Sequence, residues 1–143
     1  MQISQCAPGD EIFAHQCPAT GTIRVFNATT ALRAALVGDP NAEKLLVPYD
    51  EDFAKVIRER RGVEEERLAS MPPEKLSWPI LCVEMEDDTS LIIDGHHRYL
   101  LLGLRGDKEL RMLRWKRGTW DKFLVEGIPE DIAKKLLPEG TFS

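Results

Sequence analysis

The sequence is poor in cysteine and contains no long apolar run. Its three cysteines, Cys6, Cys17 and Cys82, are odd in number and far apart, so they do not form the pattern of a secreted disulfide framework. The chain starts without a basic segment followed by an apolar one, and we therefore expect no signal peptide. No apolar stretch approaches the length of a membrane span. These absences predict a protein of the reducing cytoplasm with no membrane partner.

An excess of basic residues is also missing. The chain has 19 Lys and Arg residues against 24 Asp and Glu residues, with a formal net charge of −5. Sequence-independent binding of DNA depends on many Lys and Arg contacts with phosphates, so the charge does not favour DNA as the partner. The densest basic patch consists of Lys108, Arg111, Arg114, Lys116 and Arg117. This patch indicates either a charged sheet edge that resists aggregation or contacts with phosphates or an acidic partner.

The length of 143 residues and the ordinary balance of apolar and charged residues fit one compact domain. The alternation of strand-like and helix-like segments predicts an α/β (α+β) fold, with a small mixed sheet and helices packed on it. Residues 1–43 are expected to form a hairpin–helix extension, with strands over 11–17 and 22–26 and a helix over 28–37 that Asn27 caps. Residues 44–143 are expected to form the core with C-terminal helices.

The core is expected to contain further strands and helices in a definite order. Strands are predicted over residues 45–48, 80–85, 90–93 and 110–115. Helices are predicted from Asp50 to Arg61, over 63–71, over 96–104, from Thr119 or Asp121 to Val125, and over 129–137. The apolar residues of the helix over 96–104 predict that this helix is buried.

The sharpest chemistry lies in the segment Asp94–Arg98, where a strand turns abruptly into a helix. Gly95 allows a tight turn and the close approach of a ligand to the backbone. The first amides of a helix, here those of Gly95–Arg98, have no intrahelical partners and suit a phosphate or carboxylate. The Arg98 guanidinium can bind the same anion through paired hydrogen bonds. The segment therefore predicts an anion-binding strand–turn–helix.

The candidate catalytic residues of this segment are His97, His96 and Asp94. The two histidines lie about 100° apart on a helix, so one is expected to meet the ligand while the other packs or holds the loop. His97, or with less support His96, would donate to a phosphate oxygen or move a proton. Asp94 could orient a histidine, cap the helix or hold a metal through water. A purely structural role for the whole group is the alternative.

At these residues the sequence resembles the ParB/sulfiredoxin-like superfamily, in particular the ParB-like nuclease domain type. The specific part of the resemblance is the run Gly95–Tyr99 between an apolar strand and an apolar helix; the weaker pattern extends from the strand at Leu45 to Trp115. The resemblance implies a small α/β domain that binds a nucleotide, ATP or CTP, at the turn. On this basis Gly95, His97 and Arg98 are expected to bind phosphate.

The departures from the family narrow the expected activity. Sulfiredoxins, which use ATP to repair a sulfinic acid, resemble Gly-Cys-His-Arg at this turn, and His96 stands in the place of that cysteine. The missing thiol excludes a sulfinic acid reductase. Partition proteins, which hydrolyse CTP, resemble Gly-Glu-Arg-Arg here and carry a helix-turn-helix domain afterwards. The residues that follow Trp115 are too few for such a domain.

Two classes of function are therefore expected. The first is an enzyme or switch that hydrolyses a nucleoside triphosphate, transfers a phosphoryl group or cleaves a phosphodiester, with Mg²⁺ if a triphosphate is the ligand. The second is a module, of the kind that a phage or plasmid encodes, that uses the phosphate pocket to bind a ligand or a protein without turnover. The sequence does not determine the oligomeric state.

Other candidate residues carry weaker signals. Cys6, His15 and Cys17 could supply three zinc ligands, although no fourth ligand or paired Cys-x-x-Cys supports the site. Cys82 is expected to be a small buried hydrophobic residue. The acidic candidates for a general base or Mg²⁺ ligand are Glu51, Asp52 and Glu59. Arg58, Arg60, Arg61 and Arg67 could approach the same cleft. Trp115 and Trp120 are expected in the core, although one of them could stack on a base.

Overall fold

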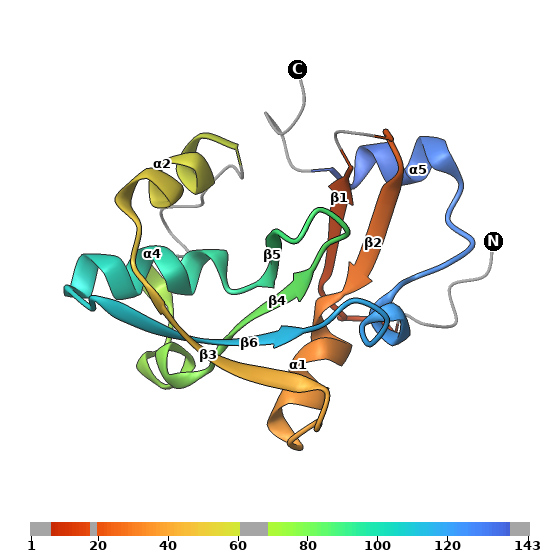
Figure 1. Ribbon diagram of the computed structural model, residues 1–143. Coiled ribbons are helices and arrows are strands. Elements are labelled where there is room, and N and C mark those ends of the chain that lie inside the picture. Colours follow the sequence, from red (N-terminus) through yellow and green to blue (C-terminus); the bar gives the residue numbers. More distant parts are fainter. Residues whose placement is uncertain (1–6, 18–19, 61–68, 138–143) are drawn as a thin grey trace.

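A computed structural model describes residues 7–17, 20–60 and 69–137 of the chain (Figure 1). The described residues form an α+β fold with two sheets, as the sequence predicts. The strands are β1 (Ile12–Gln16), β2 (Ile23–Asn27), β3 (Ala42–Pro48), β4 (Ile80–Glu84), β5 (Ser90–Asp94) and β6 (Glu109–Trp115). The helices are α1 (Ala28–Leu36), α2 (Glu51–Arg60), α4 (His96–Arg105), α5 (Glu130–Lys135) and the 3-10 turns η1 (Pro73–Ser77) and η2 (Asp121–Phe123).

The larger sheet has the strand order β3-β6-β4-β5. β3 pairs antiparallel with β6, and β4 pairs antiparallel with β5 as the predicted hairpin. β4 and β6 run parallel, and the chain between them passes through β5 and α4. Because β5 is an outermost strand and α4 follows it directly, the start of α4 lies at an edge of the sheet.

The two faces of this sheet bury different side chains, as expected for strands in which successive residues point to opposite sides. On one face, Ile80 and Met112 pack with Ile57 of α2 and with Tyr99 and Leu100 of α4. On the other face, Leu81, Val83, Ile93 and Trp115 pack with Ala31 of α1 and Phe123 of η2. The sheet is thus a central layer with helices on both sides (Figure 1).

The N-terminal hairpin and α1 share this core. Phe26 of β2 is fully buried in the same cluster as Trp115. The Asn27 side chain accepts a hydrogen bond from the Thr30 amide at 3.0 Å, so the predicted helix cap is confirmed. β3 begins at Ala42, so its first two residues belong to the segment 1–43 that was predicted as the extension. The extension and the core therefore meet across one continuous apolar cluster.

Two helical segments differ from the sequence prediction, and a third lies largely outside the described residues. The segment 121–125 is helical only in the short turn η2. Its last residues lie alongside β2, because the Val125 amide donates to the Val25 carbonyl at 2.8 Å. The helix α4 is buried on one face only, with Leu104 69% exposed, because its last turn extends beyond the sheet. The helix predicted over 63–71 lies largely outside the described residues, although Ala69 and Ser70 are helical.

Gly103 inside α4 makes room for an aromatic ring. A Cβ at this position would overlap the ring of Tyr49, which packs at 5.1 Å from the ring of Tyr99. We expect Gly103→Ala to lower the free energy of unfolding by about 1–2 kcal/mol, because this overlap outweighs the gain of about 1 kcal/mol in helix propensity. Urea denaturation measures the change. In a Tyr49→Ala background the same substitution should be neutral or stabilising, whereas stabilisation of the wild-type chain would contradict the packing.

Candidate anion-binding site

The turn between β5 and α4 depends on Gly95. This residue caps α4 in the left-handed conformation, with φ of 106°, which an L side chain rarely adopts. A Cβ here would lie 3.0 Å from Arg98 Nη2 and 3.2 Å from Ile80 Cγ1. Glycine is therefore required both by the backbone angle and by the close approach of the Arg98 guanidinium.

Arg98 lies in the first turn of α4 and is only 6% exposed. Its Nη2 atom donates to the Pro79 carbonyl at 3.1 Å and to Asp94 Oδ2 at 3.2 Å. The guanidinium lies 6.0 Å from the centre of the Trp78 ring. The buried Nε atom has no hydrogen-bond acceptor among the described residues. Because a guanidinium has five N–H donors, these contacts hold the group in place and still leave it donors for a ligand.

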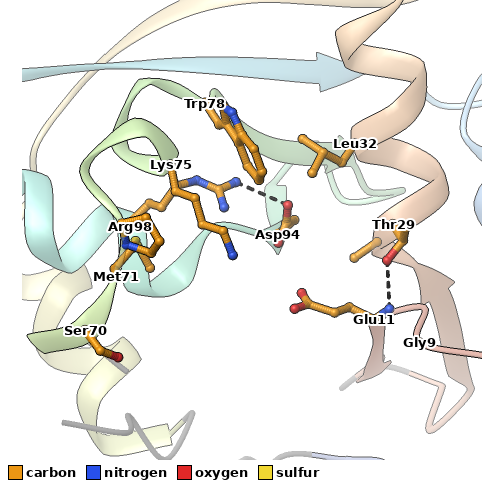
Figure 2. Close-up of a pocket in the computed structure, with 12 residues that line it drawn as sticks. Gly9, Glu11, Thr29, Leu32, Ser70, Met71, Lys75, Trp78, Asp94 and Arg98 are labelled. Atoms are coloured by element: carbon orange, nitrogen blue, oxygen red, sulfur yellow. Dashed lines mark hydrogen bonds and ion pairs between the residues drawn. The ribbon is translucent and has the colours of Figure 1, made fainter. Parts of the chain in front are cut away.

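A cavity of about 320 Å³ lies against the Arg98 guanidinium (Figure 2). Three parts of the chain line it. Asp94 and Arg98 come from β5 and α4, and Ser70, Met71, Pro72, Lys75 and Trp78 come from η1 and its flanks. Gly9, Glu11, Ala28, Thr29 and Leu32 come from the N-terminal extension. The cavity is therefore a site that the extension and the core build together.

Two cationic groups occupy one side of this cavity. Figure 2 shows the Lys75 ammonium and the Arg98 guanidinium on the same side, below the Trp78 ring. The Lys75 ammonium lies 5.7 Å from the centre of that ring. No carboxylate within the described residues forms an ion pair with Lys75. Asp94 forms an ion pair with Arg98, so Lys75 is the cation of this wall that has no described carboxylate partner.

Glu11 faces these cations from the opposite wall, with its carboxylate directed into the cavity (Figure 2). Its backbone is held against the start of α1, since the Glu11 amide donates to Thr29 Oγ1 at 2.8 Å and the Ala28 amide donates to the Glu11 carbonyl at 2.9 Å. The site thus presents cations on one wall and a carboxylate on the other.

The structure separates the members of the predicted motif. Asp94 and Arg98 line the cavity, whereas Gly95, His96 and His97 are not among its lining residues. The His96 ring stacks on Phe13 of β1, with 5.3 Å between ring centres. His97 is half-buried. Asp94 forms an ion pair with Arg98, and Gly95 is the N-cap residue of α4. The motif therefore contributes to the cavity through Asp94 and Arg98.

Tyr99 anchors this end of α4 to the rest of the core. Its hydroxyl accepts a hydrogen bond from the Asp50 amide at 2.8 Å, and its ring meets that of Phe53 edge to face at 5.2 Å. Burial raises the pKa of Tyr99 above its ordinary value. These contacts of Tyr99 fix the position of the first turn of α4, which contains Arg98.

Sequence reasoning missed Glu11, Lys75 and Trp78. Lys75 lies in η1, and Trp78 lies between η1 and β4. The one signal in the sequence is a lysine and a tryptophan in the segment before an apolar strand. Glu11 has no local signal, because its role depends on how the hairpin packs. Of the tryptophans that sequence analysis did consider, Trp115 and Trp120 are buried in the core as predicted.

The other predicted sites do not join this cavity. His15 and Cys17 line a separate cavity with Glu86 and Asp87, while Cys6 is outside the described residues. Within those residues, no three His, Cys, Asp or Glu side chains are grouped so that they could hold a metal ion. Cys82 is fully buried, and this burial raises its pKa to about 12.

The predicted acidic and basic groups are likewise dispersed. The exposed residues Glu51, Asp52, Arg58 and Glu59 lie on α2 and do not line the cavity. Arg61 and Arg67 are outside the described residues, as is the side chain of Arg60. In the basic patch, Arg114 pairs with Glu43 at 3.1 Å and Arg117 pairs with Asp88 at 2.8 Å. Part of that patch is thus neutralised by neighbouring carboxylates.

Comparison of the chain with protein-family models, curated proteins and solved structures finds no significant match. Within the part of the chain that the structure describes, no helix combines the length and apolar character needed to cross a membrane.

Proposed function

We propose that the protein binds a phosphate-bearing ligand, of which a nucleotide is the best fit, in the cavity at Arg98. The observation that carries this proposal is the buried Arg98 guanidinium, held by Asp94 and Pro79 on the same wall as the Lys75 ammonium. A guanidinium and an ammonium side by side are the groups with which proteins bind phosphate oxygens. The two carboxylates that line the cavity, Asp94 and Glu11, match these cations in number, and both cations lie on one wall.

The proposal agrees with the resemblance to the ParB/sulfiredoxin-like superfamily, in which the glycine–arginine turn binds nucleotide phosphates. Here the arginine side chain, and not the histidines, reaches the cavity. The Trp78 ring beside both cations offers an apolar surface for a base. We propose a cytoplasmic protein, and the acidic chain makes a free nucleotide a better candidate than DNA.

Mg²⁺ fits this cavity when the ligand is a triphosphate. Mg²⁺ is commonly bound by one or two carboxylates together with substrate phosphates and water. Asp94 and Glu11 both line the cavity and are the residues that would hold the ion, which would neutralise charge on the phosphates. Lys75 and Arg98 would bind the remaining phosphate oxygens and orient the phosphate chain between the two walls.

Turnover is a second candidate, favoured by the Glu11 carboxylate that faces the two cations (Figure 2). A carboxylate in this place could accept a proton from water or from a substrate hydroxyl. His96 and His97, which we expected to move a proton, do not line the cavity. Binding without turnover is consequently the better-supported function, and phosphoryl transfer, triphosphate hydrolysis or phosphodiester cleavage would depend on Glu11.

The test is a thermal-shift screen of ATP, CTP and pyrophosphate with and without Mg²⁺. A ligand that binds only the native state raises the melting temperature, and the rise grows with the logarithm of the ligand concentration above the dissociation constant, so at least one of these probes should raise it. No shift with any of them would contradict the proposal. Phosphate release measured on the same samples distinguishes turnover from binding alone. If turnover is seen and Glu11→Gln and His97→Ala leave it unchanged, neither side chain takes part in the chemistry.

Lys75→Ala should weaken binding of the probe that gives the largest shift. A hydrogen bond to a charged group contributes about 1.5–3 kcal/mol, so we expect the dissociation constant to rise about tenfold or more. Titration calorimetry measures the change. Lys55→Ala is the matched control, since Lys55 is an exposed lysine of α2 that does not line the cavity. Equal affinity of the two variants would place the anion elsewhere.

A further inference from the structure

A second surface with its own chemistry lies on the sheet, where β3 and β6 run beside η1. A groove of about 510 Å³ follows these strands, and its lining comes from both of them and from the segment that leads into β4. The lining residues are Lys44, Leu45, Leu46, Ser77, Pro79, Arg111, Met112 and Leu113. Leu46 is 62% exposed. The groove therefore combines an apolar floor with two cationic side chains.

The two cations are not neutralised within the described residues. Arg111 Nη2 donates to the Ser77 carbonyl at 3.1 Å, which is a neutral acceptor. Neither Lys44 nor Arg111 forms an ion pair with a described carboxylate, whereas Arg114, farther along the same strand, pairs with Glu43. On a chain of net charge −5, this groove is a local positive site beside an exposed leucine.

The groove lies on one face of the sheet and not along its free edge, because β6 lies between β3 and β4. Lys44 and Leu46 are two residues apart, so their side chains leave the same face of β3. Their partners in the strand pair, Leu113 and Arg111, lie beside them. Each of the two strands therefore contributes one cation and one leucine to this face.

We propose that this groove binds an extended acidic segment of a partner protein, which lies across the exposed face of β3 and β6. Acidic side chains of the segment would meet Lys44 and Arg111, and an apolar side chain would cover Leu46. A second copy of this chain fits less well, because packing this groove on the same groove of a symmetry mate would bring cationic side chains together with no carboxylate in either lining. A nucleic acid backbone would not use the apolar floor formed by Leu46 and Leu113.

The proposal is tested with two labelled peptides of seven residues, the length of β3. One carries Glu and Leu in turn at its odd-numbered positions with Ser between them, so that both kinds of side chain leave the same face of an extended chain. The other carries Lys in place of Glu. We expect the acidic peptide to bind with a dissociation constant below about 100 μM in fluorescence anisotropy, and to shift the amide NMR signals of residues 44–46 and 111–113. The Lys-containing peptide should bind at least about tenfold more weakly.

Variants at exposed positions separate this surface from general stickiness. K44E, and independently L46D, should weaken the acidic peptide at least about tenfold. Lys135→Glu on α5, another exposed lysine outside the groove, should leave binding unchanged. The proposal is overturned by equal binding of both peptides, by absence of binding up to about 1 mM, or by unchanged binding in both groove variants. Tighter binding of single-stranded DNA at the same amides, or self-association that K44E abolishes, would also overturn it.

Discussion

Arg98→Ala is expected to lower the free energy of unfolding by roughly 3–5 kcal/mol. The guanidinium is 7% exposed and the Asp94 side chain 14% exposed, so the substitution removes the cation from a carboxylate that water reaches poorly. The Pro79 carbonyl loses the hydrogen bond from Nη2 as well. Chemical denaturation measures this loss as a shift of the midpoint at a constant slope.

The matched control lies on the same helix. Arg105 also pairs with an aspartate, Asp107, at 2.6 Å, but its side chain is 55% exposed. Exposed ion pairs contribute about 0–1 kcal/mol, so Arg105→Ala should change stability by no more than that. Similar losses for the two variants would show that the Arg98 ion pair is as solvated as the Arg105 pair, and would contradict its buried position in the site.

Arg98→Ala also tests ligand binding separately from folding, when the melting temperature is measured at several probe concentrations. If the variant still folds, we expect no rise in melting temperature with any nucleotide or pyrophosphate at which the wild type responds. Arg98→Lys keeps one positive charge but lacks the planar, multiply donating group. We therefore expect it to recover part of the stability and less of the affinity, a split that a purely structural arginine would not produce.

Gly95→Ala is expected to cost about 2–4 kcal/mol of stability and to abolish binding of the anionic probe. Holding an alanine in the left-handed region costs about 1–2 kcal/mol, and the added Cβ would crowd Arg98 Nη2 and Ile80 Cγ1. Relieving that contact must displace either the guanidinium or the first residue of β4. Stability is measured by denaturation, and binding by the thermal shift with the same probe.

Gly106→Ala tests whether the contact matters beyond the backbone angle. Gly106 ends α4 with φ of 96°, and a Cβ there would meet no atom within 4 Å. This variant bears the conformational cost alone, about 1–2 kcal/mol, and should retain binding. If the two alanine variants were equally stable and both bound the probe, the close approach of Arg98 to Gly95 would not be part of the site.

Local signals in the chain were sufficient for most of the elements. The strand–glycine–helix transition at Gly95, the Asn27 cap and the apolar runs of β4 and β5 each depend on neighbouring residues, and the structure contains all three. Arg98 was likewise predicted as a cation directed at a ligand site, and it lines the cavity. The segment 121–125 departed from its local pattern because Phe123 and Val125 are buried, which holds the segment against β2.

The sequence by itself determined an α+β chain whose helix α4 begins at a glycine turn with an arginine one turn later, because turns and caps are properties of adjacent residues. The tertiary structure alone decided which groups share the cavity. It placed Glu11 opposite Lys75 and stacked His96 on Phe13 instead of turning it into the cavity. The physical reason is that packing of α1 and the hairpin on the sheet brings together residues more than 60 positions apart, and no local pattern records such a contact.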